Sequence, residues 1–73
     1  DIPDIRIKNK SISALDLVVL SGVVKSKSEA RRLIEQGGLE VQSRVLNNPQ
    51  EVINFEGGEA VKIGKRHFFR IKT

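Results

Sequence analysis

The chain has 73 residues and a net charge of +4 at pH 7, with 38% hydrophobic and 30% charged residues. This length fits one domain, and the composition is that of a globular protein rather than a disordered segment. The sequence contains no cysteine, which excludes disulfides and thiolate metal cages, and no apolar run of membrane-spanning length. Since it also lacks a basic start followed by an apolar core, we expect no secretory signal. We therefore expect a cytoplasmic protein without a membrane partner.

The positive charge is concentrated after residue 24. Residues 1–24 carry three cations and three anions, whereas residues 25–44 and residues 45–73 each carry five cations and three anions. The uneven distribution says more about a partner than the total charge does. An anionic partner is therefore expected to contact the chain beyond residue 24.

Residues 1–10 alternate loosely between apolar and polar side chains. Ile5 and Ile7 fall on one side of an extended segment, and Pro3 prevents a helix. We interpret residues 1–10 as a linker or a short edge segment, and residues 11–73 as the folded domain.

A first helix is predicted to begin after Ser13, or after Ser11 just before it. Asp16 stands three residues after Ser13, the spacing of a capping box. The apolar residues of 14–20 cover most of the helix circumference, so we expect this helix to be sandwiched between other elements. Gly22 is suited to end it, with a short connection to a second helix that packs against it.

The most informative stretch, residues 26–38, predicts that second helix from end to end. Ser26 and Glu29 have capping-box spacing, so the helix begins at Lys27. Gly37 is suited to the left-handed conformation that ends a helix, which places the last helical residue near position 36. Its narrow apolar stripe consists of Ala30, Leu33 and Ile34.

The side of this helix away from the stripe is basic. Lys27 and Arg31 flank the stripe, while Ser28 and Arg32 lie on the outward face. Backbone N–H groups at the helix start, close to Lys25, form a potential phosphate site. In the alternative interpretation, Glu29 and Glu35 pair with the two arginines on an ordinary solvated helix.

After residue 38 the pattern changes to that of strands. Residues 39–41 alternate and are expected to form a small hairpin with residues 45–46, and residues 47–49 form a turn. Residues 52–55 supply a further apolar patch, and residues 60–63 and 67–72 are predicted strands joined at 64–66. Two helices followed by short antiparallel strands make an α+β domain.

Further cations and one aromatic side chain from this region are candidates for the basic surface. The cations are Arg44 at the hairpin tip, Lys65 and Arg66 at the last turn, and Arg70 and Lys72 on the last strand. Alternatively, they are scattered solubilising charges. Phe68 and Phe69 point to opposite sides of a strand, so one is expected in the core while the other packs at an edge or stacks on a base.

No catalytic site is expected in these residues. The one histidine, His67, stands on a predicted strand without a carboxylate or cysteine nearby in sequence to orient it. Gly57 and Gly58 lack the lysine and the following helix of a phosphate loop, which indicates a turn. We expect a chain that is not an enzyme by itself and binds no cofactor or metal.

Residues 26–34 (SKSEARRLI) and 36–41 (QGGLEV) resemble the signature of the RNA-binding domain named after small-subunit ribosomal protein S-four. Residues 15–17 (LDL) and the ending 63–72 (IGKRHFFRIK) are most similar to the C-terminal domain of bacterial tyrosyl-tRNA synthetases. The resemblance runs from residue 12 onward. It agrees with a chain that begins at Asp1 and contains no methionine, which we expect to be a piece of a longer protein.

The resemblance implies a domain that grips the variable arm and anticodon stem of the tyrosine tRNA. Aminoacylation, with ATP and magnesium, would belong to a catalytic domain of a homodimeric parent enzyme, and the piece itself would be an inactive monomer. The implied RNA-facing residues are Lys25, Lys27, Ser28, Arg31, Arg32, Arg44, Lys65 and Arg66.

One departure from the family pattern concerns the hairpin turn. The family usually has Asn-Gly there, whereas this chain has Ser43 and Arg44 after Gln42, so we expect a longer or differently shaped loop.

Two alternative functions stay open. One is the RNA-binding domain of a ribosome-associated factor or pseudouridine synthase, and the other is a protein-interaction module.

Overall fold

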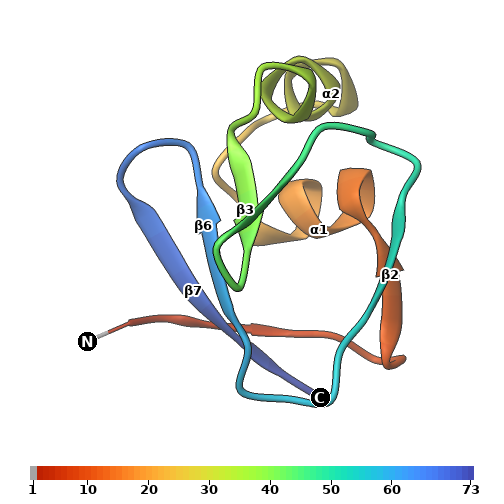
Figure 1. Cartoon of the computed structure of the whole chain (residues 1–73), viewed down its shortest axis with the longest axis vertical. Helices are drawn as coiled ribbons and strands as arrows, with labels where there is room; N and C mark the ends of the chain where they lie inside the picture. Colours follow the sequence, from red (N-terminus) through yellow and green to blue (C-terminus); the bar gives the residue numbers. More distant parts are fainter. Residues whose placement is uncertain (1) are drawn as a thin grey trace.

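The structure is a computed structural model, and it describes residues 2–73. Two helices lie on one side of a five-stranded sheet with the strand order β1-β7-β6-β3-β4, and a two-stranded sheet, β2-β5, completes the fold (Figure 1). All pairings are antiparallel except that of β1 with β7. The predicted α+β class is confirmed.

The first residues contribute to the sheet and to the core. Strand β1 (Asp4–Arg6) is an edge strand that pairs in parallel with β7 (His67–Lys72). Ile5 and Ile7 are both buried in the main hydrophobic cluster. Alternating burial of this kind is typical of a strand with one face on the core.

Helix α1 (Ala14–Ser21) begins at Ser13, whose hydroxyl accepts a hydrogen bond of 3.1 Å from the backbone N–H of Asp16. It ends at Gly22, which has the expected left-handed conformation, with φ of 79°. Our prediction that this helix is sandwiched is wrong, because Val19 and Leu20 are exposed. The apolar residues exceed what one neighbouring layer can bury, so part of the helix circumference faces solvent.

Helix α2 (Lys27–Glu35) has the predicted ends. The Ser26 hydroxyl accepts a hydrogen bond of 3.2 Å from the backbone N–H of Glu29, and Gly37 follows the helix with φ of 80°. Ala30 and Ile34 are fully buried and Leu33 is half-buried against the core. The narrow apolar stripe is thus confirmed, and the remaining sides of the helix are free for other contacts.

Strands β3 (Leu39–Val41) and β4 (Arg44–Leu46) form the expected hairpin, but our expectation of a longer loop is wrong. The turn is a tight two-residue one at Gln42 and Ser43, both with positive φ, 52° and 69°. Two positive φ values are the signature of the type I′ turn that Asn-Gly favours, so this chain forms the same kind of turn with less favourable residues. Arg44 is therefore the first residue of β4.

The sequence patterns did not predict the small sheet of β2 (Ser11–Ser13) and β5 (Val52–Asn54). Ile53 and Phe55 enter the core as the apolar patch suggested.

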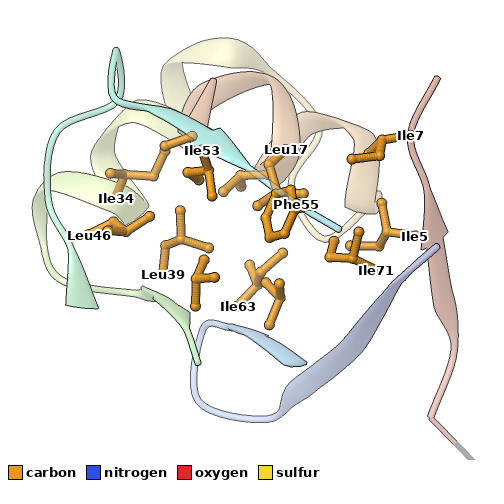
Figure 2. Packing of buried hydrophobic residues seen from close by; sticks show 14 of the residues in the cluster. Ile5, Ile7, Leu17, Ile34, Leu39, Leu46, Ile53, Phe55, Ile63 and Ile71 are labelled. Atoms are coloured by element: carbon orange, nitrogen blue, oxygen red, sulfur yellow. The ribbon is translucent and has the colours of Figure 1, made fainter. Parts of the chain in front are cut away.

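Strands β6 (Ala60–Ile63) and β7 have the predicted bounds and are joined at residues 64–66. Figure 2 shows the buried side chains gathered between the helices and the hairpin of β6 and β7.

Candidate nucleic-acid interface

Four of the predicted RNA-facing residues share one surface of α2. Lys27, Ser28, Arg31 and Arg32 are all exposed, and with Glu35 they line one shallow hollow of about 360 Å³. The buried Ala30 and Ile34 fix this orientation, because they hold the opposite side of the helix against the core. We call Lys27, Ser28, Arg31 and Arg32 the cationic face.

Lys27, Arg31 and Arg32 form no ion pair within the part of the chain that the structure describes. Among residues 2–73 there are two ion pairs, Arg44 with Glu51 at 2.9 Å and Lys62 with Glu40 at 3.7 Å. Neither pair includes Lys27, Arg31 or Arg32. The alternative interpretation, in which Glu29 and Glu35 pair with the two arginines, is therefore wrong.

A groove of about 750 Å³ runs between α2 and the turn that joins β6 to β7. Its walls carry three cations, Arg32 from α2, Lys62 from β6 and Lys65 from the turn. They also carry two carboxylates, Glu29 from α2 and Glu40 from β3. Because Arg32 belongs both to this groove and to the cationic face, the two surfaces are continuous. We call this feature the α2 groove.

Backbone geometry explains why the α2 groove has this position. Leu39 of β3 pairs with Ile63 of β6, so the end of β6 lies beside the start of β3. The backbone N–H of Gly64 then donates a hydrogen bond of 2.7 Å to the carbonyl oxygen of Gly38. Figure 1 shows α2, the start of β3 and the β6–β7 turn at the same end of the molecule.

The remaining predicted residues lie in different places. Lys25 is exposed immediately before the cap of α2, next to the cationic face in sequence. Lys65 joins Arg32 in the α2 groove, whereas its neighbour Arg66 lines a separate hollow with the start of β7, Phe68 included, and the start of the chain. Arg44 is held by Glu51 and lines neither the α2 groove nor the hollow of the cationic face.

Sequence reasoning missed Lys62 as a groove residue. In the alternating strand 60–63, Val61 and Ile63 are buried and Lys62 points to the other side. The alternation alone indicated that the Lys62 side chain points outward. That Lys62 lies near α2 depends on the pairing of β6 with β3, which the alternation does not encode.

Within residues 2–73 no group of three or more His, Asp or Glu side chains is arranged to hold a metal ion. His67 is exposed at the start of β7. None of the helices described is both long and apolar enough to cross a membrane. The arrangement is suited to binding an anion through exposed cations.

Residues 15–63 match the model of the S4 domain family. Among curated proteins, the chain is 39% identical over 71 residues to a tyrosine–tRNA ligase of Aquifex aeolicus, covering 97% of this chain and 18% of the relative. It is 41% identical over 69 residues to a tyrosine–tRNA ligase of Dehalococcoides mccartyi, covering 93% and 17%. A third such ligase, of Borrelia turicatae, is 45% identical over 65 residues, covering 84% and 16%. The chain thus spans less than a fifth of the length of these relatives.

Proposed function

The chain belongs to the S4 domain family, and on that premise we propose that it is the RNA-binding domain of a tyrosine–tRNA ligase. In this proposal it holds the tyrosine tRNA by the variable arm and anticodon stem. The three relatives described above are tyrosine–tRNA ligases that align over 84–97% of this chain. Activation of tyrosine with ATP and magnesium takes place in a separate catalytic region of a homodimeric, cytoplasmic parent, and the chain by itself is an inactive monomer.

One observation carries this proposal: the exposed cations of the cationic face continue into the α2 groove, and among residues 2–73 Lys27, Arg31 and Arg32 form no ion pair. Phosphate contacts supply most of the sequence-independent affinity for nucleic acid, because each neutralised phosphate releases counterions. A structured RNA that presents two lines of phosphates across a narrow space is suited to a surface with cations on both sides of a groove.

Recognition in this proposal depends on phosphates and shape more than on base contacts. The chain contains no tryptophan or tyrosine and three phenylalanines, so extensive stacking on aromatic side chains is not available. A long variable arm offers a distinct helical shape beside the anticodon stem. The domain therefore contributes affinity and orientation, and the chemistry is performed elsewhere.

The test compares the affinity of the chain for two transcripts. One is a tyrosine tRNA with its long variable arm, and the other is the same tRNA with that arm replaced by a short loop. We expect tighter binding of the first, with affinity that falls as salt rises. Equal affinity for both would contradict the assignment to the variable arm, and no affinity for either at low salt would contradict RNA binding itself.

A further inference from the structure

The outer face of the five-stranded sheet, which points away from the core, carries a row of three side chains. Glu40 of β3 is paired in register with Lys62 of β6, and Lys62 is paired in register with Phe68 of β7. Directly opposed residues of antiparallel strands project to the same side of a sheet. Both helices lie on the other side, beyond the buried cluster (Figure 2).

Phe68 is the exposed aromatic side chain of the chain. Of the three phenylalanines, Phe55 is buried and Phe69 packs against the core, whereas Phe68 is 51% exposed. A half-exposed ring on a rigid strand loses little conformational freedom when a flat ligand stacks on it. This ring is therefore suited to a contact that the fold itself does not use.

Lys62 connects Phe68 with the α2 groove. Its ammonium lies 5.6 Å from the centre of the Phe68 ring and 3.7 Å from the Glu40 carboxylate. Lys62 and Glu40 line both the α2 groove and a second hollow, of about 260 Å³, beside Phe68. A ligand held by Arg32 and Lys65 in the α2 groove thus has a continuous surface leading to the Phe68 ring.

We propose that Phe68 is a stacking site for one unpaired base of the bound RNA, with Lys62 as the cation beside the phosphate of that nucleotide. This inference rests on the proposed RNA-binding function and names a contact within it. The occupant is a nucleotide because the ring is flat and accessible and the adjoining groove carries three cations against two carboxylates, with Arg32 and Lys65 outside any ion pair among residues 2–73. When the base stacks, Lys62 exchanges its contact with the ring for one with the phosphate.

The chain offers a clean fluorescence test because it contains no tryptophan or tyrosine. In the variant Phe68→Trp the new indole is the single strong fluorophore, and an aromatic ring is kept at the site. We expect the indole emission of this variant to be quenched when it binds a tyrosine tRNA transcript. A blunt RNA duplex without unpaired bases is expected to bind through the cationic face and to leave the emission unchanged.

A second variant measures the contribution of the ring to affinity. Phe68→Leu is expected to weaken binding of the tRNA transcript by about 5- to 100-fold, the loss typical of one base–aromatic contact. Val52→Ala, at an exposed apolar position of the other sheet, is the matched control and is expected to leave the affinity unchanged.

Two results would overturn the stacking site alone. The first is a Phe68→Leu variant that binds the tRNA with wild-type affinity. The second is indole emission of Phe68→Trp that is the same with the tRNA and with the blunt duplex. In both cases tRNA binding must still depend on Arg31. A wild-type chain that binds neither RNA at low salt would overturn the stacking site and the proposed function together.

Discussion

The backbone N–H of Gly64 donates a hydrogen bond of 2.7 Å to the carbonyl oxygen of Gly38. Gly38 follows the end of α2 and Gly64 begins the turn from β6 to β7. This bond extends the pairing of β3 with β6, which holds two segments far apart in sequence side by side. Lys65 consequently lies across the α2 groove from Arg32. The arrangement of the cations follows from the backbone rather than from contacts between the side chains.

Replacing both Arg31 and Arg32 with alanine is expected to weaken binding of tyrosine tRNA without unfolding the chain, because both side chains are exposed. Neutralising about four phosphates gives a slope of roughly −3 in a plot of log affinity against log salt concentration, and the double variant should reduce it to roughly −1.5. Arg44→Ala is the matched control, since Arg44 is already paired with Glu51. An unchanged slope in the double variant would contradict the role of the cationic face.

Lys65→Ala is expected to reduce the magnitude of the same slope by about 1, the effect of losing one phosphate contact. Arg44→Ala is the control, because Arg44 is paired with Glu51 and lines neither the α2 groove nor the hollow of the cationic face. Titrations of both variants with the same transcript at several salt concentrations measure the difference. Equal losses in the two variants would show that binding depends on the total charge of the chain and not on the α2 groove.

Gly38→Ala is expected to lower the free energy of unfolding by about 1–3 kcal/mol. A Cβ atom at this position would lie 2.9 Å from the carbonyl oxygen and from two side-chain carbons of Leu33. The same Leu33 carbonyl accepts a hydrogen bond of 2.9 Å from the Gly38 N–H, so the backbone has little room to move away. Urea unfolding measures the change.

The control for this variant is Lys25→Ala at an exposed position, where the change should stay within about 0.5 kcal/mol. If Gly38→Ala were as stable as the wild-type chain, the close packing of the end of α2 on β3 would be wrong.

The stability of the chain should depend on the protonation of Glu59. Backbone N–H groups of Glu56 and Gly57 donate hydrogen bonds of 2.8 Å to its carboxylate, and these bonds, that of Glu56 foremost, lower the pKa of Glu59 below 4.5. A pKa that is lower in the folded state stabilises the fold above the unfolded value, and this stabilisation is lost as the pH falls through the folded value. Glu59 is partly exposed, so the effect is small.

Thermal unfolding of Glu59→Gln checks this dependence. The variant should be less stable than the wild-type chain at pH 7, and the difference should disappear as the pH is lowered below the folded pKa of Glu59. Glu56→Gln is the control, because the Glu56 side chain accepts no hydrogen bond among residues 2–73. A gap of constant size at every pH would contradict the role of the carboxylate.

Local signals allowed α2 and the last two strands to be predicted from the sequence. Ser26, Glu29 and Gly37 act within one helix, so spacing alone fixed its ends. The alternation in 60–63 and 67–72 likewise depends on one strand at a time. The cationic face of α2 was predictable for the same reason, since helical periodicity separates Ala30 and Ile34 from Arg31 and Arg32.

Features that depend on distant pairing were not predictable in this way. Strands β2 and β5 have three residues each and acquire their conformation from one another. Leu20 is exposed because only part of the surface of α1 is covered by other elements. The apolar pattern of one helix does not tell how many elements surround it. The position of Lys62 in the α2 groove was not predicted, because it depends on the register between β3 and β6.

The most direct test of the account maps the backbone amide resonances of the isotopically labelled chain during titration with a tyrosine tRNA transcript at low salt. We expect the largest shifts at residues 27–32 and 62–65, and we expect these shifts to disappear when salt is raised. The proposed interface would be contradicted if saturating tRNA left these resonances unshifted. Shifts confined to the exposed side of α1 or to the surroundings of Arg44 would contradict it as well.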